Sequence, residues 1–258
     1  MTGAIIGDVV GSRFEFNNTQ DPNFEFFHET CDFTDDTILT IAVAETLVDC
    51  GTSATAADFR EHVLKWCRKY PYPTGAYGAS FVHWLCSRDH APYQSFGNGA
   101  VMRLSPIIKA ARSLAEAKRL AIECVRISHD HTEALIAAET LVTACYKMQR
   151  LGYPKNVCGK QLREAYDVLP EFERGRFNET CQYCTPLAFE IFEKSRNFED
   201  AIRQAILFGG DSDTLAAIVG TLAESYYGVP RWMESKVCEE YIPKDMLYVI
   251  AKFNNKFK

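Results

Sequence analysis

Apolar residues recur at helical spacing along almost the whole chain, and this periodicity most limits the possible fold. One such run extends from Phe59 to Tyr70, and Pro71 ends it because proline cannot continue a helix. Residues 132–151 and 215–227 show the same pattern. The period-two alternation of half-buried strands is nearly absent. The sequence therefore predicts an all-α protein.

Two short acidic clusters lie near opposite ends of the chain, and each precedes a strongly apolar run. The first reads TDDT over residues 34–37, and the second reads GGDSDT over residues 209–214. Asp and Thr are common N-caps, so either cluster alone indicates an ordinary helix start. Together they form an all-oxygen set that suits a hard divalent ion such as Mg²⁺ or Mn²⁺. Because both clusters must meet to bind a metal, we expect a single domain over residues 1–258.

Composition and charge exclude some classes of function. The 258 residues are 47% hydrophobic and 24% charged, which is ordinary for a folded soluble protein. No apolar run reaches the length of a membrane span, and the N-terminus lacks the basic region of a signal peptide. A net charge of −6 with scattered Lys and Arg argues against non-specific nucleic-acid binding. We expect a cytoplasmic monomer.

Ten cysteines are many for this length. Most occupy apolar helical positions, such as Cys67 and Cys145, where a free thiol behaves as a small hydrophobe. Without an export signal we interpret them as reduced thiols. Cys181 and Cys184 form a lone CxxC without a second pair, whereas a structural zinc needs four ligands. We expect no zinc.

Three further motifs allow a functional and a structural interpretation each. Residues 3–15 read GAIIGDVVGSRFE, in which glycines at four-residue spacing favour close helix packing and Glu15 could be a surface acid. Residues 95–103 read SFGNGAVMR, either a turn or a loop whose backbone approaches a ligand and whose N–H groups hold phosphate. His129 and His131 lie between two helices, where they could bind metal, cap a helix or contact a ligand.

The order of these motifs resembles the ADP-ribosylglycohydrolase family, which includes the dinitrogenase reductase-activating glycohydrolases. The matching motifs are GxxxGDxxGxxxE, TDDT, SFGNGAxMR, SHxH and GGDSDTxAAxxG, and the resemblance extends from Gly3 to about Trp232. It implies a compact orthogonal helical bundle around a dinuclear Mg²⁺ or Mn²⁺ site. Phe96 departs from the family because a tyrosine is common at that position, and the chain is short for the family.

The resemblance also implies roles for particular residues. The expected metal ligands are Thr34, Asp35, Asp36, Asp211, Asp213 and Thr214. The residues expected to contact ADP-ribose are Ser95, Phe96, Gly97, Asn98, Gly99 and His129. Asp35 is expected to contact substrate and water as a catalytic residue, and Glu15 to contact the metal site and gate it.

The implied activity is metal-dependent hydrolysis of the bond between C1″ of ADP-ribose and an acceptor. The acceptor could be arginine, serine, a nucleic acid base or an acetyl group, and we favour arginine on a protein. Two other functions stay open. A non-catalytic ADP-ribose-binding regulator would use the same fold, and a metal-dependent nucleotide phosphohydrolase would also use acidic clusters.

Overall fold

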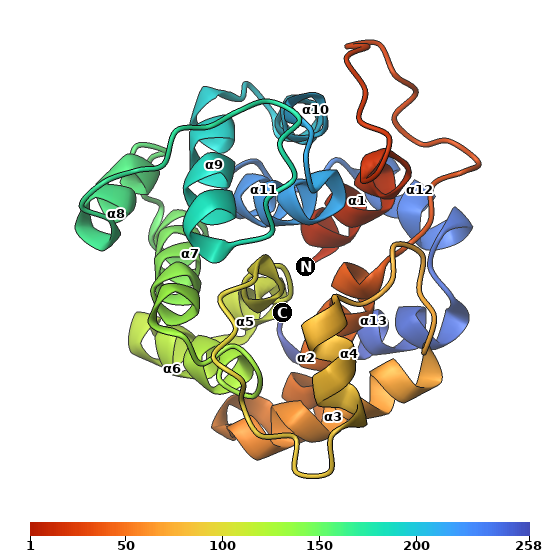
Figure 1. Ribbon diagram of the computed structural model, residues 1–258, viewed down its shortest axis with the longest axis vertical. Coiled ribbons are helices and arrows are strands. Elements are labelled where there is room, and N and C mark those ends of the chain that lie inside the picture. The colour runs from red at the N-terminus through yellow and green to blue at the C-terminus, as the bar shows by residue number, and fades with distance from the viewer.

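The computed structural model describes residues 1–258 and consists of helices joined by loops (Figure 1). The α-helices are α1 Thr2–Gly11, α2 Asp35–Cys50, α3 Ala56–Lys69, α4 Ala79–Cys86, α5 Ser105–Ala110, α6 Leu114–Val125, α7 Thr132–Leu151, α8 Val157–Ala165, α9 Cys181–Lys194, α10 Phe198–Phe208, α11 Ser212–Tyr227, α12 Arg231–Glu240 and α13 Lys244–Lys256. The short 3₁₀ helices are η1 Ser12–Phe14, η2 Gly51–Ser53 and η3 Asn98–Ala100. There is no sheet, and only two isolated β-bridges occur. The predicted all-α class is confirmed.

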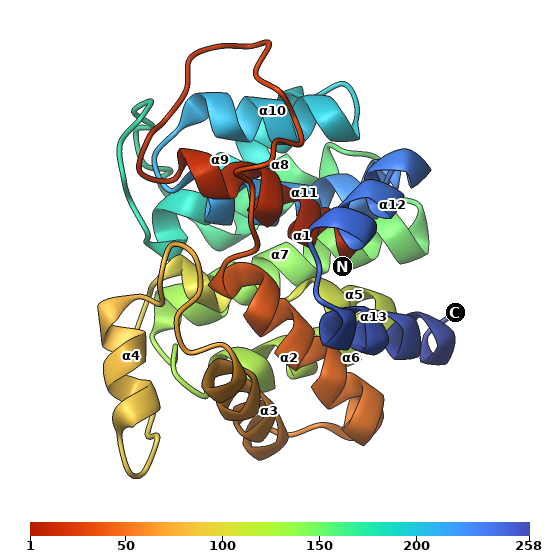
Figure 2. The ribbon, with the colours of Figure 1, turned by 90° about the vertical axis from the view of Figure 1, so that its right-hand side faces the viewer.

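Helices α1 and α11 lie side by side at the centre of the upper half of the molecule (Figures 1 and 2). Glycines let their backbones approach closely. A methyl group on Gly7 would lie 2.1 Å from the carbonyl oxygen of Ala216, and one on Gly220 would lie 2.1 Å from that of Gly3. The interpretation of these glycines as packing residues is therefore correct. The two ends of the chain are joined through this contact.

Helix α2 begins beside the α1–α11 pair and runs into the lower half, where α3 and α13 pack against it (Figure 2). Helices α5, α6 and α7 complete that side of the molecule. One apolar cluster of 77 buried residues draws on both ends of the chain. This continuous core favours the expected single domain, which stays a prediction.

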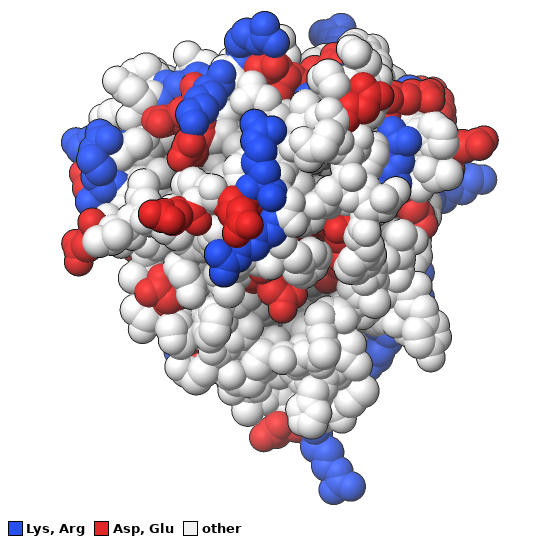
Figure 3. Space-filling view, turned by 45° about the horizontal axis from the view of Figure 1, so that its top comes forward, with Lys and Arg blue, Asp and Glu red and all other residues white.

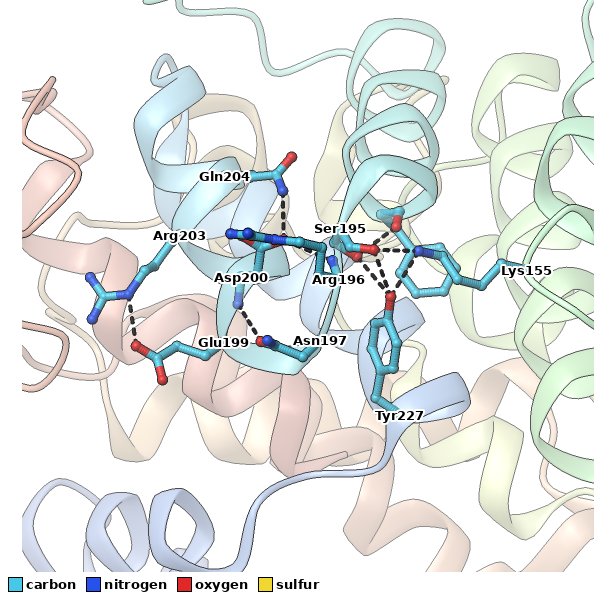
Figure 4. Close-up of polar contacts among 10 residues, drawn as sticks. Lys155, Ser195, Arg196, Asn197, Glu199, Asp200, Arg203, Gln204 and Tyr227 are labelled. Carbon is cyan, nitrogen blue, oxygen red and sulfur yellow. Dashed lines mark hydrogen bonds and ion pairs between the residues drawn. The ribbon is translucent and has the colours of Figure 1, made fainter.

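Polar contacts stabilise the turn between α9 and α10 (Figure 4). Asn197 caps α10, because its Oδ1 accepts a hydrogen bond of 2.9 Å from the Asp200 main-chain N–H. The Lys155 ammonium donates to the Ser195 carbonyl oxygen at 2.7 Å and to the Tyr227 hydroxyl at 2.8 Å. These contacts hold the turn before α10 against the end of α11. At its other end α10 leads through Gly209 and Gly210 into the second acidic cluster.

The surface carries acidic and basic side chains in a mixed pattern. On the face shown in Figure 3, Lys and Arg are interspersed with Asp and Glu and form no continuous basic patch. None of the helices combines the length and apolar character needed to cross a membrane.

Candidate active site

Asp8, the only acid in α1, is fully buried and connects α1 to the start of α2. Its carboxylate accepts hydrogen bonds from the main-chain N–H groups of Thr34 at 3.1 Å and Thr37 at 3.0 Å. It also accepts from the hydroxyls of both threonines, 2.7 Å away in the case of Thr34. Burial raises the pKa of Asp8 to about 6, although these hydrogen bonds oppose the shift. Asp8 thereby fixes the position of the first acidic cluster.

The two acidic clusters start their helices in different ways. Thr34 is an ordinary N-cap, because its hydroxyl oxygen accepts a hydrogen bond from the Asp36 main-chain N–H at 3.2 Å. Asp211 occupies the N-cap position of α11 but makes no capping bond. Its Oδ2 instead accepts a hydrogen bond of 2.6 Å from the Asn98 side-chain amide. The cap interpretation thus accounts for Thr34 and fails for Asp211.

The clusters meet at the contact of α1, α2 and α11. Thr214, in the first turn of α11, donates from its hydroxyl to Asp36 Oδ2 at 3.1 Å. Carboxylate oxygens then gather in two groups whose atoms lie within 4.8 Å of one another and which share one aspartate. The first group is Asp8, Asp36 and Asp213, and the second is Glu15, Asp211 and Asp213.

The chemistry of these groups fits hard divalent cations. Asp36 Oδ1 and Asp213 Oδ1 are buried and have no hydrogen-bond partner. Burial, with the neighbouring carboxylates, raises the pKa of both residues well above the usual range. Unpartnered buried oxygens beside like charges are costly unless a cation lies among them. All donors are oxygens, as Mg²⁺ and Mn²⁺ prefer.

Asp35 and Glu15 face a cavity next to these groups. Asp35 belongs to neither acidic group, although it was predicted to bind metal. Burial, followed by the charges of Asp8 and Asp211, raises its pKa well above the usual range. Glu15 is half-buried, and burial together with Asp211 raises its pKa to about 8. Glu15 thus lies partly exposed in the cavity lining.

Asp8 was not predicted as a ligand. The glycine spacing of residues 3–15 indicated a packing motif with one functional acid at its end. An acid in the middle of a wholly apolar helix was the available signal, because such a group is rarely buried without a partner or a metal. The structure places Asp8 in the first acidic group, with Asp36 and Asp213.

The cavity has a volume of about 640 Å³. Asp211 and Asp213 form part of its buried wall, and the exposed rings of Phe16 and Phe177 form part of its rim. Its lining also includes every residue that the sequence predicted to contact ADP-ribose: Ser95, Phe96, Gly97, Asn98, Gly99 and His129. Thr34 and Asp36 are absent from the lining, which includes the other four predicted metal ligands: Asp35, Asp211, Asp213 and Thr214.

The loop over residues 95–99 is pinned to the segment that enters α9. The Asn98 main-chain N–H donates to the Glu179 carbonyl oxygen at 2.7 Å, and the Cys181 N–H donates to the Phe96 carbonyl oxygen at 2.8 Å. The Gly97 N–H lies 3.3 Å from the Ser95 hydroxyl oxygen. The N–H and the side-chain amide of Asn98 are therefore both engaged with protein, so Asn98 acts on this loop by fixing its shape.

The two histidines have different surroundings. His131 caps α7, because its Nδ1 accepts from the Glu133 main-chain N–H at 3.1 Å. Its ring also packs edge-on against Phe96, with ring centroids 5.2 Å apart. His129 is buried and lines the cavity, where a methyl group on Gly99 would lie 3.3 Å from its Nε2. His129 alone faces the cavity.

Cys181 and Cys184 support the same loop as thiols. Cys181 donates from Sγ to the Gly97 carbonyl oxygen at 3.0 Å, and Cys184 donates to the Asn178 carbonyl oxygen at 2.8 Å. All ten cysteines are free, and burial raises the pKa of Cys184 well above the usual thiol value. The CxxC motif thus packs beneath the cavity wall, and no histidine joins it.

Comparison with known proteins places this geometry in a family. The profile of the ADP-ribosylglycohydrolase family matches residues 1–252. A human ADP-ribosylhydrolase is 23% identical over 96% of this chain and 90% of its own. An ADP-ribosylarginine hydrolase of Pseudomonas putida is 25% identical over 95% and 75%. The ADP-ribosyl-[dinitrogen reductase] glycohydrolase of Rhodospirillum rubrum is 23% identical over 88% and 84%.

A solved structure shares the fold. It is described as an ADP-ribosylglycohydrolase-related protein complex, and it superposes with a TM-score of 0.77 at 24% identity, covering 99% of this chain and 95% of that chain. The profile match spans nearly the whole chain and agrees with the motif order in the sequence. The protein therefore belongs to the ADP-ribosylglycohydrolase family.

Proposed function

We propose that the protein hydrolyses the bond between C1″ of ADP-ribose and an acceptor, using two divalent cations, Mg²⁺ or Mn²⁺. The observation that carries this proposal is the pair of acidic groups that share Asp213 beside a cavity lined by residues 95–99. A nucleotide phosphohydrolase would need the acidic groups but gives no reason for the loop. A non-catalytic sensor would give no reason for unpartnered carboxylate oxygens.

In this proposal the acidic groups hold the cations. Asp8, Asp36 and Asp213 would hold one, and Glu15, Asp211 and Asp213 the other, with the hydroxyls of Thr34 and Thr214 completing the set. Bound there, the cations would supply positive charge to bind the vicinal ribose hydroxyls, orient a water and offset negative charge.

Asp35 takes the proton of the attacking water. It lines the cavity and stands outside both acidic groups, so its carboxylate is free to act as a base. Glu15 lies beside the rim residue Phe16 and contacts the loop at Gly75, where a methyl group would lie 2.7 Å from Glu15 Oε2. This position suits the gating role.

The ADP-ribosyl group occupies the remainder of the cavity. The loop formed by Ser95, Phe96, Gly97, Asn98 and Gly99 follows the diphosphate and the adjoining ribose. Gly97 and Gly99 allow close approach because they carry no side chain. Phe96 is 43% exposed and offers an aromatic face, although it lacks the hydroxyl of a tyrosine.

The acceptor in this proposal is an arginine side chain of a protein. Phe16 and Phe177 are stacked at the rim, with ring centroids 6.1 Å apart and planes inclined by 15°. Guanidinium groups stack on aromatic faces and are attracted to acids. Glu15 and Glu179 also line the cavity, and the only Lys or Arg in its lining is the fully buried Arg103. A cationic leaving group fits this rim better than a neutral hydroxyl.

The test is incubation with ADP-ribosylated arginine, serine and DNA and with O-acetyl-ADP-ribose, each with and without Mg²⁺ or Mn²⁺, followed by mass spectrometry. Release of intact ADP-ribose from the arginine conjugate, only with metal, is expected. AMP as product would indicate a phosphohydrolase. Binding of ADP-ribose without release from any conjugate would indicate a sensor.

The role of the rim is tested with a matched pair of variants. Phe16→Ala removes one ring of the stacked pair, whereas Tyr248→Ala removes a ring that is 61% exposed on α13, away from the cavity. We expect Phe16→Ala to lower kcat/KM for the arginine conjugate by about threefold to tenfold, as one cation–π contact would. Tyr248→Ala should leave kcat/KM for the arginine conjugate unchanged, and equal effects of the two variants would refute the arginine subsite.

The expected monomeric state and cytoplasmic location also belong to this proposal. Gel filtration tests the first, and cell fractionation tests the second.

A further inference from the structure

Arg103 is one of the largest fully buried side chains of the protein, and it has no acidic partner. It forms none of the ion pairs in the structure, and its Nε and Nη1 are buried without hydrogen-bond partners. A guanidinium stays charged and can only donate hydrogen bonds. A buried charge without a partner is costly, so a structural role alone does not account for an arginine at this position.

The remaining nitrogen, Nη2, reaches the loop that carries His129. It lies 3.5 Å from the Cys124 carbonyl oxygen and 3.4 Å from the Ser128 hydroxyl oxygen. The Ser128 hydroxyl is in turn 2.8 Å from His129 Nδ1. Arg103, Ser128 and His129 thus form a continuous chain of contacts, in which Arg103 and His129 belong to the cavity lining and Ser128 is fully buried between them.

The direction of this chain follows from counting protons. Arg103 must donate to the Ser128 oxygen, so that oxygen accepts. The Ser128 hydroxyl has one proton, the residue is fully buried, and His129 Nδ1 is the only acceptor within hydrogen-bond distance. If Nδ1 carried a proton, the hydroxyl proton would have no acceptor in a buried site. Nδ1 must therefore accept, and in a neutral ring the proton lies on Nε2.

We propose that Arg103 and Ser128 are positioning residues that hold His129 as the neutral Nε2–H tautomer, so that it donates a hydrogen bond to an acceptor oxygen of the ligand in the cavity. The Nε2 atom faces the glycines of the ligand loop, where a methyl group on Gly97 would lie 3.6 Å away. Oxygens of a diphosphate or a ribose are the acceptors that this position would meet.

The electrostatic surroundings of His129 also favour its neutral form. Burial lowers the pKa of His129 well below its usual value, and the charge of Arg103 lowers it further. The ring of Tyr93 lies beside the imidazole, with centroids 5.9 Å apart, and carries no charge at neutral pH. His129 therefore differs from a cationic phosphate ligand, because it offers one directed donor and no charge.

The proposal rests on the proposed function only for the identity of the ligand, since the tautomer can be measured without ligand. Nitrogen-15 NMR of the imidazole in the ligand-free protein should show a protonated Nε2 and an unprotonated Nδ1. Ser128→Ala should give a measurable fraction of other protonation forms, and Ser128→Thr, which keeps the hydroxyl, should restore the original spectrum. A wild-type ring protonated on Nδ1 would overturn the proposal.

A second pair of variants tests the donor at the cavity. The side-chain amide of His129→Gln ends near the position of Nε2, whereas that of His129→Asn ends near Nδ1. ADP-ribose binding by calorimetry should be weakened about tenfold or more by Asn and by Ser128→Ala, the effect of losing about one hydrogen bond, and less by Gln. Mg²⁺ affinity should be unchanged in all of them, which excludes a general structural loss.

The outcomes separate this proposal from the proposed function. The positioning role would be refuted, even in an active hydrolase, by equal ADP-ribose affinity in the His129→Gln and His129→Asn variants. It would also be refuted if Ser128→Ala left both the His129 tautomer and the ADP-ribose affinity unchanged. Absence of hydrolysis on every conjugate, with the expected tautomer and ADP-ribose affinities, would refute the hydrolase and leave the role of Arg103 and Ser128 intact. If Ser128→Ala does not fold, the His129 pair decides.

Discussion

The side-chain amide of Asn98 donates a hydrogen bond to the carboxylate of Asp211, with Nδ2 and Oδ2 2.6 Å apart. This bond connects the ligand loop to the second acidic group. Asp211 has no capping bond to its own helix, so Asn98 supplies its orientation. Partners that orient a metal ligand commonly change metal affinity when they are removed.

We therefore expect Asn98→Ala to weaken Mg²⁺ or Mn²⁺ binding by about tenfold to a hundredfold, measured by calorimetry on ligand-free protein. Ser95→Ala is the matched control, because Ser95 lies on the same loop and its hydroxyl contacts the Gly97 N–H and Tyr93 but no residue of the acidic groups. The control should bind metal as the wild type does. Unchanged metal affinity in Asn98→Ala would show that the amide only shapes the loop.

The variants Asp35→Asn and Asp213→Asn should differ in their affinity for metal. Asp213 is shared by both acidic groups, so Asp213→Asn should weaken metal binding and hydrolysis together. Asp35 lies outside both, so Asp35→Asn should retain most of the metal affinity. Each change should lower single-turnover hydrolysis by at least about a hundredfold.

Stability of the metal-free protein tests the repulsion among these carboxylates. Asp35 and Asp213 lie in the first turns of α2 and α11 and not at the N-cap positions, so each change removes repulsion without removing a cap. Melting temperatures of metal-free Asp35→Asn and Asp213→Asn should therefore equal or exceed that of the wild type. Full activity in both variants would exclude the dinuclear metal site.

Helix positions could be predicted from the sequence because helical periodicity and caps are local. Helix α7 has the expected bounds, and α11 begins only three residues before the expected start at 215. The sequence could not predict that Asp36 joins the first acidic group while Asp35 lies outside both groups. Neighbouring residues on a helix point about 100° apart, so only the packing of α2 against α1 decides which carboxylate joins Asp8.

The environment of the loop over residues 95–99 also required the structure. Its glycines indicated close approach to a ligand, but the hydrogen bond from Asn98 to Asp211 joins residues far apart in the chain. Likewise, the sequence could not decide between the possible roles of His129 and His131. Only the fold shows that His131 caps a helix and that His129 faces the cavity.

The contact between α1 and α11 predicts a strong position dependence of glycine substitutions. Gly7→Ala would place a methyl group 2.1 Å from the Ala216 carbonyl oxygen, so the helices must separate. We expect a loss of about 3 kcal/mol or more in the free energy of unfolding, as overpacked sites show at their upper end. Gly78→Ala is the control, since nothing lies within 4 Å of its added methyl. Equal denaturation midpoints for the Gly7→Ala and Gly78→Ala proteins would contradict the close contact between α1 and α11.

The metal-free protein should lose stability as the pH rises. Asp8 has its pKa raised from 3.8 to about 6, and Glu15 from 4.5 to about 8. For such groups the folded state binds more protons than the unfolded state, so their contribution is complete below about pH 4 and is lost up to about pH 8. Melting curves in chelator over this range should show the decline, and Glu15→Gln should flatten its upper part. Saturating Mg²⁺ should reverse the decline near neutral pH.

The joining of α1 to α11 has a consequence for how the protein is made. During synthesis α1 leaves the ribosome about two hundred residues before α11 does. Until then its glycine face has no partner, and neither acidic group can assemble, because both need Asp213. Metal capture therefore requires contacts between residues far apart in the chain, and a nascent chain arrested before α11 should be sensitive to proteases regardless of the metal supply.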